Sequence, residues 1–213
     1  MKTIVKSTPA PACLARAQQA GWNWDQFGKL DHDGHVEVLQ LALHDQKKEC
    51  AYTGLWLGEG TKLKVHIDHF QKKGIYQDQE FAWENLFAAA KDRKDGADYK
   101  DNQISGPREK ADATYSTFWS PLQANLEKAF WYRQDGTIQP DPGLSEEDRV
   151  KAQNTIEMFN LNSPDLKSKR YGIILKTRGV HDLSDDMVRE CLATQGFSFL
   201  VNFELAHRKR DSE

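Results

Sequence analysis

The 213-residue sequence predicts an α+β fold, a mixed and largely helical domain with small hairpins. Polar and apolar residues alternate from residue 63 to 68, which is typical of a half-buried strand. Apolar residues recur at helical spacing between 36 and 48. An Asp-Gly pair at 135–136 separates two short segments with strand character and predicts a hairpin turn. We therefore expect helices beside short antiparallel strands.

Residues 1–48 are predicted to form an N-terminal arm and helices. An extended arm over residues 2–6 should end at the proline-containing stretch that follows, because proline continues neither a strand ladder nor a helix. A short helix is expected over 13–20, and a longer one over 36–48. The aromatic residues between them, Trp22, Trp24 and Phe27, are interpreted as core or as a subunit contact.

Residues 111–213 are predicted to form an accessory α+β region that packs on the rest of the chain or binds a partner. Ser145 and Asp148 have the spacing of a helix cap and predict a helix to about Phe159, with Val150, Ile156 and Phe159 facing inward. The further expectations are a hairpin at 130–138, a strand or the start of a helix at 171–175, a helix at 184–193 and a strand at 197–205.

The central segment, residues 61–96, brings together residue types that carry chemistry. The strand pattern places Asp68 on the polar face, and His69 follows where the strand ends. An acid and an imidazole are therefore expected to flank one small volume of space. The alanine-rich run from Ala88 to Lys94, opened by residues 83–87, predicts a helix.

This order of residues resembles the ββα-metal unit of HNH nucleases, which has an Asp-His pair on its first strand and an asparagine before its helix. The resemblance is most specific to the PtuB family, the HNH nucleases of Septu-type and retron-associated antiphage defence systems. Its motifs here are KKECAYTG, HIDHFQKK, FAWENLF and FWYRQDGTI. The resemblance implies a ββα-metal core at 49–110, between the two regions described above.

The resemblance also implies a metal-dependent endonuclease that hydrolyses phosphodiester bonds in DNA, or in RNA such as tRNA. Such hydrolysis needs a base for the attacking water and a cation for the leaving oxygen. We expect His69 to be the base and Asp68 to be a ligand of Mg²⁺ or Mn²⁺, which needs few protein carboxylates. Asn85 is expected to orient the imidazole or the loop that carries it.

The closing metal ligand of the family is a histidine or asparagine on the helix, and residues 86–101 contain neither. By comparison with the family pattern, Asp92 is the first choice for this ligand and Asp95 the second. Relatives often carry two Cys-x-x-Cys pairs that bind structural zinc. Here Cys50 stands alone, with Thr53 at the position of its mate, so no structural zinc is expected.

Basic side chains next to this unit are candidates for substrate binding. They could follow a phosphate backbone, or equally well form solvated loop and helix faces. The candidates are Lys72, Lys73, Arg93 and Lys94. His66 shares the strand face of Asp68 and is interpreted as a solvated strand histidine. Trp83 and Phe87 are interpreted as core.

The formal net charge of −3 is unusual for a protein that must find nucleic acid alone. It indicates a local positive groove or a partner that supplies the affinity. The resemblance implies such partners: a PtuA-like ATPase and, in retron systems, a reverse transcriptase with its RNA–DNA product. The alternative is a non-catalytic assembly subunit that keeps the ββα shape.

Three widely separated cysteines fit a reducing compartment, and no secretory or membrane-spanning stretch is found. The sequence therefore predicts a cytoplasmic protein that binds nucleic acid and no membrane.

Overall fold

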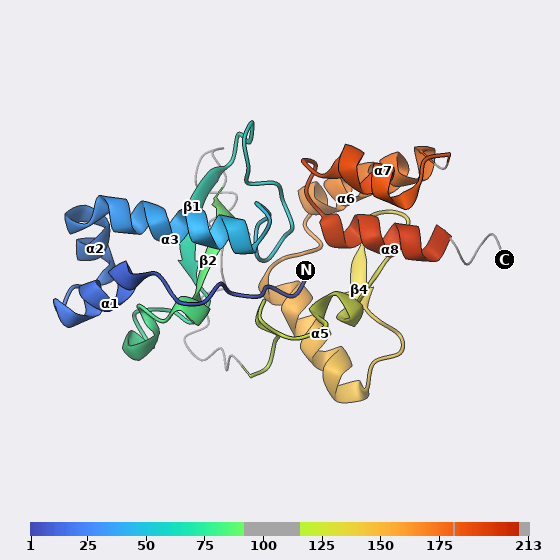
Figure 1. Cartoon of the computed structure of the whole chain (residues 1–213). Coiled ribbons are helices and arrows are strands. Elements are labelled where there is room, and N and C mark those ends of the chain that lie inside the picture. Colours follow the sequence, from blue (N-terminus) through green and yellow to red (C-terminus); the bar gives the residue numbers. More distant parts are fainter. Residues whose placement is uncertain (92–115, 181, 209–213) are drawn as a thin grey trace.

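The computed structural model describes residues 1–91, 116–180 and 182–208. The described chain is mixed α+β, as predicted, and its elements lie in two lobes joined by the N-terminal arm (Figure 1). The first lobe contains α1 (Ala12–Gln19), α2 (Trp24–Leu30), α3 (His32–Asp45), β1 (Lys64–His69) and β2 (Leu86–Lys91). The second contains β3 (Phe130–Tyr132), β4 (Ile138–Pro140), α5 (Glu146–Met158), α6 (Pro164–Gly179), α7 (Asp185–Leu192) and α8 (Ser198–Arg208).

The first lobe is built around an antiparallel pair of strands. β1 pairs with β2 in a register that sets His69 opposite Leu86, and α3 packs against both strands. The helix predicted from Ala88 to Lys94 is wrong over residues 88–91, which belong to β2. Ala88, Ala89 and Ala90 are all buried, so pairing with β1 and close packing on both faces outweigh the helical preference of alanine. Residues 92–94 lie outside the described part of the chain.

Capping residues fix where α2 and α3 of the first lobe begin. α3 starts at His32, earlier than predicted, because the Asp31 carboxylate accepts a hydrogen bond from the Gly34 N–H. The side chains of Asn23 and Gln26 form a reciprocal capping box at the start of α2. These caps set the position of Trp24, which packs beside the end of β1.

The second lobe confirms the predicted hairpin and corrects one expectation. Gly136 has φ +81° in the turn between β3 and β4, and the Ser145 side chain caps α5 as predicted. Val150, which was expected to face inward, is 51% exposed. Residues 171–175, for which a strand or the start of a helix was expected, are helical and lie within α6.

The strand predicted at 197–205 is wrong, because Ser198–Arg208 forms α8. Phe199 and Phe203 are one helical turn apart, and both rings pack against Tyr132, with centroids at 5.6 Å and 5.1 Å. The aromatic residues that suggested a strand therefore form the apolar face of a helix. Among the described residues, no helix has the length and apolar character needed to cross a membrane.

The N-terminal arm connects the two lobes. Ile4 N–H donates to the Pro121 carbonyl at 2.8 Å, and Trp83 Nε1 donates to the Ser7 carbonyl at 3.1 Å. Lys2 Nζ lies 2.5 Å from Glu49 Oε2 and 3.2 Å from Ser198 Oγ. The first residues of the chain thus hold elements from both lobes together.

Candidate active site

His69 is the last residue of β1, and its imidazole is held by a backbone carbonyl. Nε2 lies 3.0 Å from the carbonyl oxygen of Glu80. Because a carbonyl oxygen only accepts hydrogen bonds, Nε2 carries the proton and Nδ1 of the neutral ring is the acceptor. No hydrogen bond within the described residues involves Nδ1. The ring therefore presents an acceptor nitrogen in a defined orientation.

Packing keeps the His69 imidazole neutral. Its ring meets Trp24 edge to face, with centroids 4.6 Å apart, and burial lowers the pKa of His69 to about 4. The Glu80 side chain accepts a hydrogen bond from Trp24 N–H at 2.9 Å. Glu80 thus ties the start of α2 to the turn whose carbonyl holds the histidine.

Asp68 precedes His69 and has different neighbours. Its Oδ2 accepts a hydrogen bond from the Tyr52 hydroxyl at 2.7 Å, and its Oδ1 lies 3.9 Å from His66 Nε2. Burial raises the pKa of Asp68 to about 6, and the Tyr52 hydrogen bond opposes the shift. The Asp68 side chain remains 18% exposed. Successive residues of a strand point to opposite faces, so Asp68 and His69 flank the end of β1 from its two sides.

Asn85 immediately precedes β2 and is 4% exposed. Its Oδ1 accepts from Gln71 N–H at 2.6 Å, and its Nδ2 donates to the carbonyls of Gln71 and Gln79, both at 2.9 Å. These bonds tie together the two ends of residues 71–79, the segment that joins the end of β1 to Glu80. The structure thus brings Asn85 to the loop that fixes His69, and its side chain contacts the loop rather than the imidazole.

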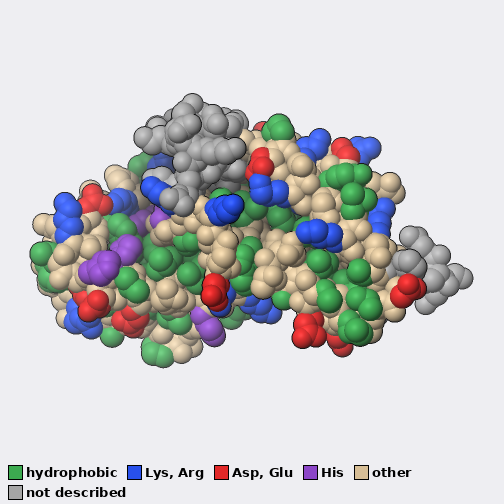
Figure 2. All heavy atoms as spheres, turned by 90° about the horizontal axis from the view of Figure 1, so that it is seen from above, with side chains coloured by type: hydrophobic (Ala, Val, Ile, Leu, Met, Phe, Trp, Pro, Cys, Tyr) green, Lys and Arg blue, Asp and Glu red, His purple; other side chains and the backbone are tan. Residues whose placement is uncertain are grey.

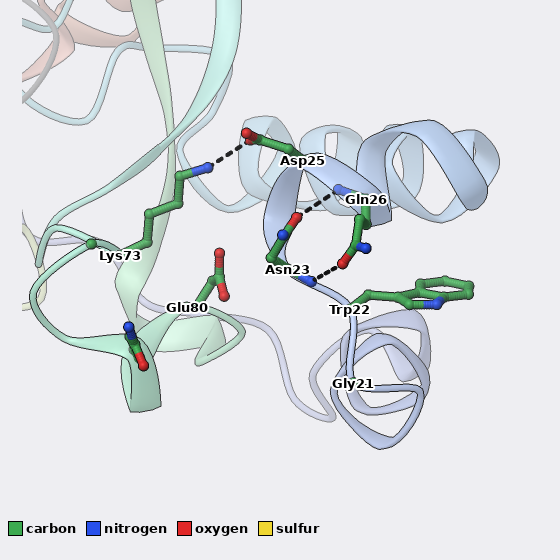
Figure 3. Close-up of a pocket in the computed structure, with 9 residues that line it drawn as sticks. Gly21, Trp22, Asn23, Asp25, Gln26, Lys73 and Glu80 are labelled. Atoms are coloured by element: carbon green, nitrogen blue, oxygen red, sulfur yellow. Dashed lines mark hydrogen bonds and ion pairs between the residues drawn. The ribbon is translucent and has the colours of Figure 1, made fainter.

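Lys73 lies at the edge of a hollow of about 510 Å³ beside this loop (Figure 3). Its ammonium is 2.7 Å from Asp25 Oδ1, and Glu80 also lines the hollow. Two carboxylates make this hollow a poor site for a phosphate. The backbone carbonyl of Lys72 accepts hydrogen bonds from Ile75 and Tyr76 at the start of the same loop.

Four of the candidate residues, Asp92, Arg93, Lys94 and Asp95, lie outside the described residues. Within the described ranges, no group of three or more histidine, cysteine, aspartate or glutamate side chains could hold a metal. Cys50 is buried, and its Sγ accepts a hydrogen bond from Ala90 N–H at 3.5 Å. Of the metal-ligand candidates named from the sequence, Asp68 therefore lies within the described residues, while Asp92 and Asp95 lie outside them.

Two residues near the site were not assigned to it from the sequence. Tyr52 touches Asp68, although the sequence pattern singled out its segment only for Cys50. Lys6 donates to the Leu86 carbonyl, and its ammonium lies 3.6 Å from the centroid of the Trp83 ring. Burial lowers the pKa of Lys6 to about 7. Neither contact has a signal in the sequence, because each joins segments that meet only in the folded chain.

A scan against models of known protein families gives no match, and no curated protein matches the chain.

Proposed function

We propose that this chain is a metal-dependent endonuclease that hydrolyses phosphodiester bonds in DNA or RNA. The observation that carries the proposal is the geometry of His69. Its Nε2–H is bound to the Glu80 carbonyl, its Nδ1 is an acceptor, and a carboxylate precedes it in the chain. An imidazole held in this way can take a proton from a water molecule at a fixed position.

The Asp68 carboxylate fits a hard divalent cation. One carboxylate oxygen is bound by Tyr52, while Oδ1 has no hydrogen bond within 3.5 Å among the described residues. Asp68 would hold Mg²⁺ or Mn²⁺ through this oxygen, with Asp92 or Asp95 as a second ligand. When bound, the cation supplies neutralising charge for the phosphate and the leaving oxygen.

The other candidate residues would serve as base, as a support for the base and as contacts for the phosphate. His69 takes the proton of the attacking water at Nδ1, across the end of β1 from Asp68. Asn85 fixes the ends of the 71–79 loop and so holds the Glu80 carbonyl against the imidazole. Lys72, Arg93 and Lys94 are the candidates for contacts with the phosphate backbone, and Lys73 would join them where its ammonium leaves Asp25.

The distribution of charge supports a partner. On the face seen in Figure 2, the described Lys and Arg side chains are spread over both lobes and interspersed with Asp and Glu, and the net charge of the sequence is −3. A nuclease with this surface gains affinity for nucleic acid from an associated protein. The resemblance to PtuB-type nucleases makes a PtuA-like ATPase the proposed partner. The chain would then be the toxic effector of a cytoplasmic antiphage defence complex, in retron systems together with a reverse transcriptase and its RNA–DNA product.

The test is cleavage of plasmid DNA and of total cellular RNA with Mg²⁺ or Mn²⁺ by the wild-type chain and by His69→Ala. Loss of a general base should lower the rate by about 10²- to 10⁴-fold. His44→Ala is the matched control, because His44 is 79% exposed and lies at the end of α3. Nucleic acid that stays intact with both metals, and with the ATPase added, would reject the nuclease and favour the non-catalytic assembly subunit.

A further inference from the structure

We propose that Tyr52 is a positioning residue that fixes the Asp68 carboxylate for the divalent cation. The inference rests on the proposed function, and it adds a residue that belongs to neither the base nor the cation ligands. The Tyr52 hydroxyl donates to Asp68 Oδ2 at 2.7 Å, which directs that oxygen into the protein. Oδ1 is then the carboxylate oxygen left for a cation.

The donor in this hydrogen bond is rigid. Tyr52 has 0% exposure, and its ring stacks on Phe159 with centroids 4.5 Å apart and planes at 12°. Phe87 packs against the same ring, with centroids 6.3 Å apart. A ring enclosed on these sides cannot swing its hydroxyl away, so the carboxylate is held in one rotamer. A hydrogen bond to a ligand carboxylate of this kind commonly orients it and strengthens metal binding.

The contact also links the two lobes. Asp68 lies on β1 of the first lobe and Tyr52 lies between α3 and β1 in the chain, whereas Phe159 immediately follows α5 in the second lobe. The orientation of the carboxylate therefore depends on packing between the lobes as well as on β1 itself.

A second buried tyrosine provides a matched comparison. Tyr132 is 4% exposed, and its hydroxyl accepts a hydrogen bond from the Met1 amino group at 3.4 Å. It lies on β3 in the second lobe and makes no contact with Asp68. Tyr52→Phe and Tyr132→Phe each remove one hydroxyl from a buried ring. Comparing the two variants therefore separates a general loss of protein stability from a change in cation binding.

The experiment measures Mn²⁺ binding by electron paramagnetic resonance, without nucleic acid, in wild type, Tyr52→Phe, Tyr132→Phe and Asp68→Ala. We expect Tyr52→Phe to raise the Mn²⁺ dissociation constant by about 10- to 100-fold and Tyr132→Phe to leave it unchanged. Cleavage by Tyr52→Phe should be low at limiting Mn²⁺ and should return to within a few-fold of wild type at saturating Mn²⁺. A tyrosine with only a structural role would lower the melting temperature without moving the dissociation constant.

A second variant keeps the test decisive if Tyr52→Phe does not fold. Phe159→Leu retains the Tyr52 hydroxyl but removes the ring stacked on Tyr52. It should weaken Mn²⁺ binding by a smaller factor than Tyr52→Phe. Unchanged Mn²⁺ affinity in the folded variants would overturn the role of Tyr52 and leave the nuclease standing. If wild type shows no Mn²⁺ site that Asp68→Ala abolishes, the proposed metal site fails and the inference fails with it.

Discussion

Each lobe buries a polar side chain against backbone carbonyls, and the two cases differ in what lies beside them. In the second lobe, Arg170 is 2% exposed and donates to the carbonyls of Gly136 and Leu161, both at 2.6 Å. In the first lobe, Asn85 binds the carbonyls of Gln71 and Gln79 in a similar way.

The surroundings of the two side chains separate a structural role from a chemical one. Arg170 ties the β3–β4 turn to the segment between α5 and α6. Its guanidinium N–H groups and the carbonyls of Gly136 and Leu161 are hydrogen-bonded to each other. The loop held by Asn85 instead fixes His69, whose Nδ1 has no hydrogen bond within the described residues. Full satisfaction of buried groups stabilises a fold, whereas a fixed acceptor that remains available can react.

The largest expected change in stability is at Arg170. Arg170→Met keeps much of the side-chain volume but leaves the two carbonyls without their donor, so the free energy of unfolding should fall by about 3 kcal/mol or more. Urea unfolding measures this loss. Cleavage per folded molecule should stay as in wild type, and a selective loss of cleavage would contradict the structural role.

Asn85→Ala should affect both stability and activity. Loss of its bonds to the loop should lower the free energy of unfolding by about 2 kcal/mol. Release of the Glu80 carbonyl should lower the cleavage rate by about 100-fold, as expected when a catalytic group loses its orientation.

Asn162→Ala is the control for this prediction. Asn162 binds both Ile138 N–H and the Ile138 carbonyl, at 2.9 Å and 2.8 Å, and it lies in the second lobe. The Asn162→Ala variant should lose about as much free energy of unfolding as Asn85→Ala and should keep the wild-type cleavage rate. Equal losses of activity in the two variants would remove the distinction between the lobes.

Acidification should reveal the burial of His69. Its pKa is about 4 in the folded protein, against a usual value of about 6.5, so between these pH values the unfolded chain takes up a proton that the folded chain does not. Stability from this group is therefore complete above pH ~6.5 and decreases as the pH falls toward 4. His69→Gln lacks this titration, so the wild-type advantage over it should shrink by about 1 to 2 kcal/mol from pH 7.5 to 5. The measurement is the free energy of unfolding of wild type and of His69→Gln as a function of pH, without metal. Parallel profiles for the two proteins would contradict the prediction.

Lys73→Ala should have the smallest effect on stability. Its ion pair with Asp25 is exposed, and such pairs contribute about 0.5 kcal/mol or less. The melting temperature should therefore stay within about 2 °C of wild type. If Lys73 also contacts substrate, the variant should raise KM without changing kcat. A large loss of stability would show that the ion pair holds the loop, a role that the comparison assigns to Asn85.

Local patterns predicted local structure well. The cap at Ser145 and the turn at Gly136 depend on residues within a few positions of each other, and both were recognised. The failures were the helix over residues 88–91, which belong to β2, and the strand at 197–205. Burial against distant segments decides both cases, so propensity was a poor guide.

The candidate site was predictable to the same extent. His69 and Asn85 could be assigned to one site because the residues around them carry the family pattern. The partners that define their chemistry, the Glu80 carbonyl and the Tyr52 hydroxyl, come from the tertiary fold. A carbonyl is present at every residue and leaves no mark in the sequence, and Tyr52 stands among residues that suggest only a turn.

The stacking of Tyr52 on Phe159 also bears on synthesis of the chain. On the ribosome, Asp68 and His69 emerge well before Phe159, and Lys2 emerges 196 positions before its partner Ser198. The nascent first lobe therefore lacks the ring that steadies Tyr52 until most of the polypeptide has been made. In a cell that translates this chain, Tyr52 and Asp68 are therefore held in their final positions only after the second lobe has folded.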